Sequence, residues 1–217
     1  MNNFFNTLYS ATEQERQKFQ QIEALQKGSV GEISLQTYQA FLVQAYHHVK
    51  HTTPLLMACG SRIPQEKEWL RNAIAEYIEE EVGHQEWILN DIAATGMDSE
   101  PVRNGKPHFS TELMVAYAYD TIMRINPVAF FGMVLVLEGT SIALASNAAK
   151  KIQENLDLPD TAFSYLSSHG SLDLEHMKFF ETLMNKIDDS GDQAAIIHAA
   201  KMFYKLYGNI FCSIPLQ

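Results

Sequence analysis

The sequence predicts an all-α protein, a single-domain helical bundle of about seven helices that spans residues 1–217. Three observations predict this fold class. Nearly every long segment places its apolar residues at helical spacing, segments that alternate apolar and polar residues are absent, and 46% of the residues are hydrophobic. This apolar content suffices for one sizeable core in a chain of 217 residues.

The first two predicted helices differ in character. Residues 11–27 are polar and amphipathic, and Ser10 and Glu13 have the spacing of a capping box at the start of a helix. Residues 33–60 predict a long helix that kinks near Pro54, because proline lacks the amide that a helix interior needs.

The third predicted helix covers residues 65–95, after Pro64 and before Gly96. Two prolines and a glycine make residues 97–109 a connecting loop. The remaining predicted helices cover residues 110–125, 127–155, 160–189 and 192–207. The helix over 160–189 has a candidate break at Gly170.

Charge and cysteine usage exclude several classes of function. The net charge is −10, and the longest run of basic residues is the pair Lys150–Lys151, so we expect neither nucleic acid nor an anionic membrane as a partner. Only Cys59 and Cys212 are present, so a disulfide framework is not expected and the cytoplasm is the predicted location. We expect no signal peptide, because the N-terminus has no basic region followed by an apolar one. We expect no transmembrane helix, because no stretch reaches 18 uninterrupted apolar residues.

The stretch "EYIEEEVGHQEW", residues 76–87, contains a Glu-x-x-His pair, Glu81 and His84. Side chains three residues apart share one face of a helix, so both could reach one metal ion. Taken alone, the pair is more typical of a solvated acidic face, because other glutamates crowd the same stretch.

Glu138 is the only charged residue between Arg124 and Lys150. A helix this apolar is expected to be buried nearly all round. A buried carboxylate is costly unless it is protonated, paired with a base or bound to a metal. A base from another helix is the competing explanation, although few bases occur in apolar surroundings in this sequence.

The stretch "SSHGSLDLEHMKFF", residues 167–180, places His169, Asp173 and His176 at spacings of four and three. On a helix these positions fall within an arc of about 60°. Two partly exposed histidines with a capping aspartate are the alternative for this triplet alone. With the two other helices, the chain offers three carboxylates and three imidazoles, a donor set suited to two iron ions in a helical bundle.

These motifs resemble the haem-oxygenase-like di-iron oxidases and oxygenases, which share their fold with TenA (thiaminase II) and PqqC. The resemblance covers residues 30–205, and the His-x3-Asp-x2-His pattern is its most specific part. It implies two Fe(II) ions per chain, with O2 as co-substrate. The implied metal ligands are Glu81, His84, Glu138, His169, Asp173 and His176, with Glu80 as an alternative to Glu81, and Glu138 and Asp173 as catalytic residues.

The resemblance implies an oxidoreductase acting on a small organic substrate of the fatty acid, amino acid or amine class. It is also compatible with a homodimer, since proteins of this fold are often dimers. Apolar residues such as Phe130, Phe131, Met133 and Leu137 are expected to exclude water from the site. Three histidines on an earlier helix are candidates to face the same cavity and contact the metal ligands rather than the metal: His47, His48 and His51.

Other functions on the same fold remain as alternatives. A TenA-like thiaminase or PqqC-like enzyme would work without metal, and a thiaminase needs a nucleophilic cysteine that nothing in the sequence marks. A haem oxygenase would need one axial histidine and basic residues for the propionates. A non-catalytic helical binding protein would have no reason to bury Glu138.

Overall fold

A computed structural model describes the backbone of residues 3–216 and the side chains of these residues apart from 169–175. Helices account for nearly all regular structure in this part of the chain, and no strand occurs in it. The α-helices are α1 (Phe4–Ala11), α2 (Glu13–Gln20), α3 (Glu23–Val30), α4 (Leu35–Val49), α5 (Thr52–Arg62), α6 (Glu68–Glu81), α7 (His84–Ala94), α8 (Glu100–Arg103), α9 (Phe109–Asp120), α10 (Phe131–Leu156), α11 (Ser164–Lys186) and α12 (Ser190–Ser213).

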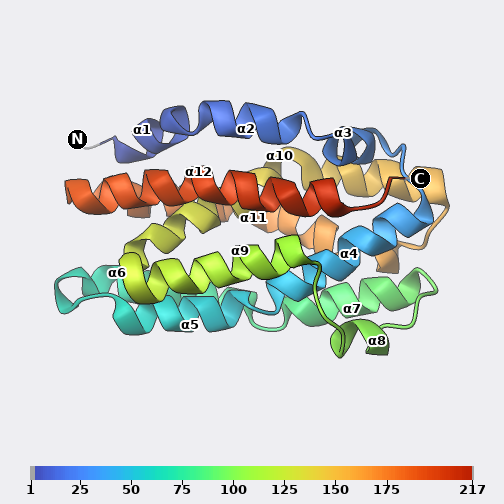
Figure 1. Cartoon of the computed structure of the whole chain (residues 1–217), viewed down its shortest axis with the longest axis horizontal. Helices are drawn as coiled ribbons and strands as arrows, with labels where there is room; N and C mark the ends of the chain where they lie inside the picture. The colour runs from blue at the N-terminus through green and yellow to red at the C-terminus, as the bar shows by residue number, and fades with distance from the viewer. Residues whose placement is uncertain (1–2, 217) are drawn as a thin grey trace.

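The all-α fold class is confirmed, but the expected number of about seven helices is wrong, because several predicted helices are divided. The segment 11–27 contributes to three short helices, α1 to α3, which run beside α12 in Figure 1. The predicted capping box at Ser10 does not form. Thr12 precedes α2, and its hydroxyl instead donates to the Leu8 carbonyl of α1 at 2.9 Å.

The two long helices of the first half also break. The first breaks between α4 and α5 at Lys50 and His51, before Pro54, which lies in the first turn of α5 where proline is tolerated. The second breaks between α6 and α7 at Gly83, whose φ of 95° is in the left-handed region.

The second half follows the predictions more closely. A short helix, α8, interrupts the predicted loop, and a π-helical turn over Thr121–Ile125 extends α9. Short 3-10 turns at Pro127–Phe130 and Asp160–Ala162 precede α10 and α11. The α11 backbone is helical through Gly170, so the candidate break there does not occur.

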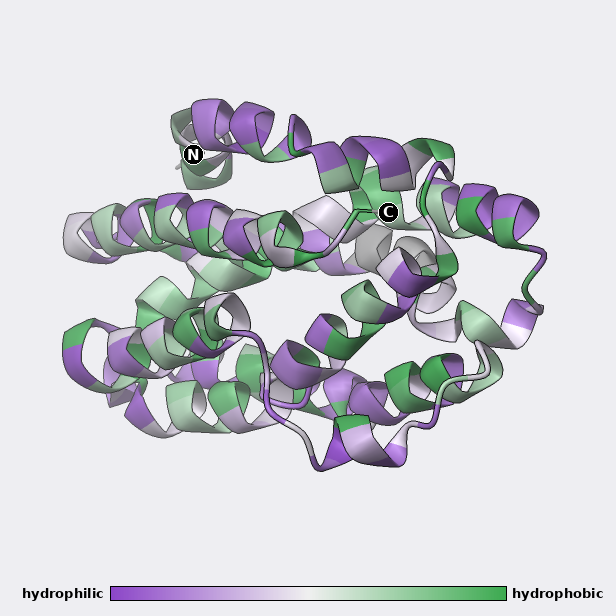
Figure 2. Ribbon diagram, turned by 45° about the vertical axis from the view of Figure 1, so that its right-hand side comes forward, coloured by the Kyte–Doolittle hydropathy of each residue, from purple (hydrophilic) through white to green (hydrophobic). Residues whose placement is uncertain are grey.

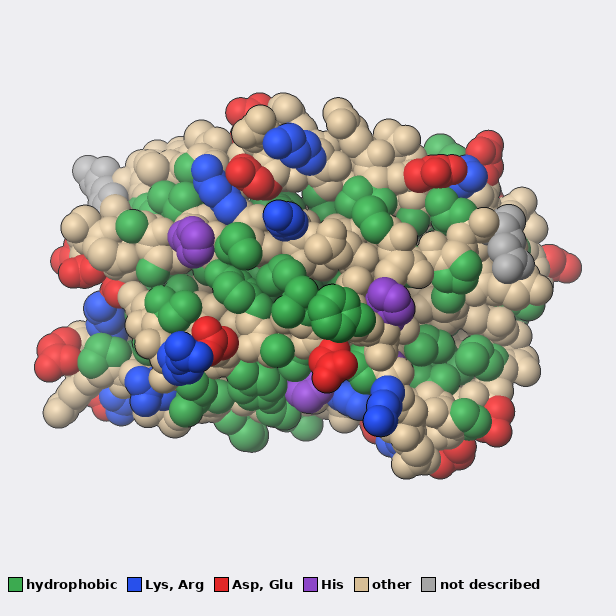
Figure 3. Space-filling model, in the orientation of Figure 1, with side chains coloured by type: hydrophobic (Ala, Val, Ile, Leu, Met, Phe, Trp, Pro, Cys, Tyr) green, Lys and Arg blue, Asp and Glu red, His purple; other side chains and the backbone are tan. Residues whose placement is uncertain are grey.

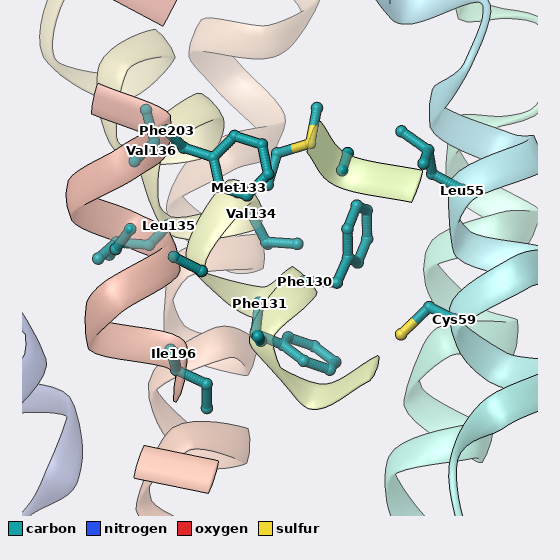
Figure 4. Close-up of a cluster of buried hydrophobic side chains, with 14 of the residues drawn as sticks. Leu55, Cys59, Phe130, Phe131, Met133, Val134, Leu135, Val136, Ile196 and Phe203 are labelled. Carbon is teal, nitrogen blue, oxygen red and sulfur yellow. The ribbon is translucent and has the colours of Figure 1, made fainter. Parts of the chain in front are cut away.

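The core surrounds the first half of α10, where Phe131 to Val136 are all buried. In Figure 4 these side chains lie between α12, which carries Ile196 and Phe203, and α5, which carries Leu55 and Cys59. A Cβ at Gly132 would lie 2.5 Å from the backbone nitrogen of Ala200, so only glycine allows α10 and α12 this close approach. Apolar residues line the inward faces of the helices and polar residues the outer ones (Figure 2).

Among the described residues, one helical stretch, Pro127–Leu156, is long and apolar enough to cross a membrane. More than half of its most apolar window, 56%, is buried inside the protein. The central helix of a soluble bundle has the same length and composition. On the face shown in Figure 3, lysine and arginine side chains are scattered among acidic ones and form no continuous basic patch.

Candidate metal centre

A cavity of about 70 Å³ lies between the central helices, and we call it the site cavity. Helices α4, α5, α6, α10, α11 and α12 all contribute to its walls. The residues that line it are His48, Val49, Thr52, Leu56, Tyr77, Glu81, Phe130, Met133, Val134, Leu137, Glu138, Ser141, Tyr165 and Tyr207. Its volume is several times what one water molecule needs.

Glu81 and His84 lie on either side of a helix break rather than on one continuous helix. Glu81 ends α6, and His84 begins α7 after the left-handed Gly83. The turn still brings the two side chains together, with His84 Nδ1 at 3.1 Å from Glu81 Oε2. His84 is almost fully buried, and its ring packs on Trp87 with the ring centroids 4.1 Å apart.

Glu138 lines the site cavity from the first half of α10. The prediction of full burial is only partly correct. The residue is partly exposed, while its Oε2 atom is shielded from solvent. Two carboxylates far apart in the sequence, Glu81 and Glu138, therefore line one cavity.

His176 of α11 faces α6 and pairs with Glu80. Its Nε2 atom lies 3.0 Å from Glu80 Oε2, and its ring centroid is 6.3 Å from that of Tyr77. Glu80 and Glu81 therefore take different places. Glu80 is half exposed and contacts His176, whereas Glu81 is mostly buried, lines the cavity and contacts His84.

Two predicted ligands, His169 and Asp173, lie outside the described side chains, although the α11 backbone is helical at both positions. Among the side chains that are described, no group of three or more His, Cys, Asp or Glu residues is arranged to hold a metal ion. The described donors form two histidine–carboxylate pairs and a third carboxylate, Glu138. In chemical type, carboxylate oxygen and imidazole nitrogen fit iron.

The pKa of the Tyr77 phenol reflects the negative charge around the cavity. Its side chain is 2% exposed, and burial raises the pKa of its phenol well above the usual range. The negative charges of Glu138, Glu80 and Glu81 raise this pKa further. With the smaller contribution of Glu76, four carboxylates act on one buried group, and a cation among them would relieve their mutual repulsion.

The three histidines of the α4–α5 region differ in position. His48 lines the site cavity, and its ring packs edge-on against Tyr207. His47 is buried outside the cavity lining, and burial lowers its pKa to about 4. His51 lies 3.3 Å from the Tyr119 hydroxyl through its Nδ1 atom. Only His48 therefore takes the expected position facing the cavity.

The expected apolar wall is also mostly present. Phe130, Met133 and Leu137 line the cavity, whereas Phe131 lies in the core against Phe180.

Neither cysteine belongs to the site cavity. Cys59 is buried, donates to the Pro127 carbonyl at 3.2 Å, and has a pKa raised to about 12 by burial. Cys212 is exposed near the end of α12. A thiol with so high a pKa is a poor nucleophile, so the thiaminase chemistry lacks its central residue in this cavity.

Asp91, which the sequence analysis did not single out, holds the start of α11 in place. Asp91 is fully buried on α7, and its carboxylate accepts hydrogen bonds from the Ser164 and Tyr165 amides, at 3.0 and 2.9 Å, and from the Ser164 hydroxyl. It therefore caps α11 from another helix. The only sequence clue was an acid within the apolar run that follows Trp87.

Comparisons with known proteins identify the family and the fold. A family model described as "iron-containing redox enzyme" matches residues 39–208. No curated protein sequence matches the chain.

Several solved structures are similar in fold. A domain of unknown function from Shewanella denitrificans, with a haem oxygenase-like fold, is 20% identical, with a TM-score of 0.84 over 97% of this chain and 90% of the other. A TenA homologue from Pseudomonas syringae is 13% identical, with a TM-score of 0.79 over 97% and 91%. A haem oxygenase from Leptospira interrogans is 14% identical, with a TM-score of 0.76 over 96% and 98%. At these identities the similarity shows the fold alone, which is the expected haem-oxygenase-like, TenA-like fold.

Proposed function

Because the chain belongs to the family of iron-containing redox enzymes, we propose that it is a non-haem di-iron oxidase or oxygenase acting on a small organic substrate with O2. The proposal rests on one observation. Glu81 and Glu138 line the same cavity, beside two histidine–carboxylate pairs. Carboxylates from different helices can bridge two cations and neutralise much of their charge.

The proposed ligands are Glu81, His84, Glu138, His169, Asp173 and His176, and the proposed catalytic carboxylates are Glu138 and Asp173. Glu80 is the nearest alternative carboxylate, because it already contacts His176. Bound Fe(II) would supply the activation of dioxygen, which the side chains alone cannot provide.

The remaining residues of the cavity have roles that follow from their chemistry. Phe130, Met133 and Leu137 limit the access of water to the reacting groups. Tyr77 keeps the proton on its Oη atom at neutral pH, because its pKa is raised, and it can therefore donate a hydrogen bond into the cavity.

The competing functions find less support. No Lys or Arg lines the site cavity, so haem propionates would lack basic partners there. No cysteine lines it either, which argues against the thiaminase reaction. A non-catalytic binding protein would gain nothing from two carboxylates in one enclosed space, because their repulsion costs stability.

The proposal is tested by loading the protein with Fe(II) under anaerobic conditions and measuring O2 uptake after exposure to O2. His84→Ala and His176→Ala should each reduce iron-dependent O2 uptake at least tenfold, since each removes a proposed ligand. The matched control is Glu181→Ala, an exposed acid on the same helix as His176. Equal uptake in all variants, or no uptake by the loaded wild type, would refute the proposal.

A further inference from the structure

A second cavity, of about 90 Å³, adjoins the site cavity, and we call it the apolar cavity. It lies among α3, α4, α10, α11 and α12, and no Asp, Glu, Lys, Arg or His among the described side chains lines it. Its walls are mainly aliphatic and aromatic, as Leu25, Phe41, Leu144 and Phe211 illustrate. The cavity is partly open to solvent, so a ligand can enter it, and its apolar walls favour an apolar occupant over water.

The two cavities meet at shared walls, because Ser141, Tyr165 and Tyr207 line both. One stripe of α10 connects them. Glu138, Ser141, Ala145 and Ala148 follow at spacings of three, four and three, within an arc of about 80° on the helix. The stripe begins at an acid in the site cavity and continues with small side chains into the apolar cavity.

The polar end of this joined space contains a hydrogen-bond donor that lacks a partner. The Tyr77 hydroxyl is buried, and no hydrogen-bond partner for it exists among the described residues. Leaving a buried hydroxyl unsatisfied is costly. A ligand with an acceptor atom in the site cavity would satisfy it.

The apolar end has space beside Gly28 that no side chain fills. Gly28 of α3 lines the apolar cavity, and a Cβ added there would meet no atom within 4 Å. Glycine inside a helix lowers helix stability relative to larger residues. Gly28 therefore leaves open a space that a leucine would fill.

We propose that the substrate is an amphiphile whose polar group lies in the site cavity within reach of the Tyr77 hydroxyl, while its apolar body occupies the apolar cavity. The inference rests on the proposed function for the role of the polar end. The apolar body runs along the α10 stripe from Ser141 towards Gly28. Its binding needs no iron, because none of the proposed ligands whose side chains the structure describes, Glu81, His84, Glu138 and His176, lines the apolar cavity.

Linear 1-alkanols from butanol to decanol are suitable probes, since they combine one hydroxyl with a chain of adjustable length. Their affinity for the iron-free protein is measured by titration calorimetry. We expect the affinity to rise about fourfold with each added methylene until the cavity is full, and then to level off. Absence of binding, or affinity independent of chain length, would overturn the proposal.

Gly28→Leu tests where the chain lies, with Gln26→Leu as the matched control. Gln26 is exposed on the same helix and lines neither cavity. Gly28→Leu should leave short alcohols unaffected and weaken the longest ones at least tenfold, while Gln26→Leu should bind all of them like the wild type. Helix propensity predicts that Gly28→Leu folds at least as stably as the wild type, and a thermal melt checks this. Equal affinities in the two variants would overturn the assignment of the apolar end.

Tyr77→Phe tests the polar end. Losing one hydrogen bond should weaken every alcohol by a similar factor, about fivefold, whatever its length. Unchanged affinities in Tyr77→Phe would contradict the proposed orientation. Iron loading is measured separately on the same preparations. Iron uptake without alcohol binding would overturn this inference alone, whereas alcohol binding without iron uptake would support it and refute the di-iron proposal.

Discussion

Glu138 and the acids of α6 give the protein a concentration of negative charge around the buried phenol of Tyr77. In the absence of a cation, these carboxylates repel one another and lose part of their hydration. The cost is acceptable in a site that binds metal. Histidines pair with two of these acids, Glu80 and Glu81, but no Lys or Arg among the described residues lines the cavity to balance the remaining charge.

Glu138→Leu should therefore separate metal binding from stability. We expect iron uptake to fall at least tenfold while the melting temperature of the iron-free protein stays the same or rises, because one repelling carboxylate is removed. Iron analysis and thermal unfolding of the iron-free protein measure the two effects. Glu154→Leu is the control, since Glu154 is an exposed acid on the same helix. A large loss of stability in Glu138→Leu would instead indicate a structural ion pair.

His47 should make the stability of the protein depend on pH. Burial lowers its pKa from 6.5 to about 4, so between these values the unfolded chain binds a proton that the folded protein does not. The free energy of unfolding should therefore rise with pH from 4 to 6.5, by up to about 3 kcal/mol, and then level off. Urea titrations across this range should show a smaller rise for His47→Gln. Identical slopes in both proteins would exclude His47 as the source.

At the scale of helices, Asp91 fixes the start of α11, the helix that carries three of the proposed ligands. Asp91→Ala leaves two buried amides and a hydroxyl without their acceptor, so we expect a loss of about 2–4 kcal/mol in the free energy of unfolding. Denaturant titration measures the loss. Asp91→Asn, which keeps one acceptor oxygen, should lose less. Equal stability of Asp91→Ala and the wild type would show that α11 does not need this cap.

The positions of the helices could largely be predicted from the sequence, whereas their breaks could not. Periodicity correctly located α10, α11 and α12, since each has an apolar face at helical spacing. The break at Gly83 had a recognisable cause, a glycine that can adopt left-handed backbone. The break at His51 had none, because its φ of −95° and ψ of −6° are open to any residue and depend on packing.

For the whole molecule, the haem-oxygenase-like fold and the family could be predicted, because the motifs lie on long helices with regular periodicity. The pairing of acids with histidines could not. Glu80 and Glu81 are neighbours in the sequence, and only the break after α6 and the approach of α11 decide which histidine each contacts. The joined cavities were also beyond prediction, since five helices contribute to the walls of the apolar cavity.

The iron content of the reconstituted protein shows whether the chain binds a pair of iron ions. The chain is loaded with excess Fe(II) under anaerobic conditions, unbound metal is removed, and iron per chain is measured beside Mössbauer spectra of the same ⁵⁷Fe sample. We expect two irons per chain with the spectrum of a coupled pair after oxidation. One iron per chain, none, or a spectrum of isolated ions would contradict it.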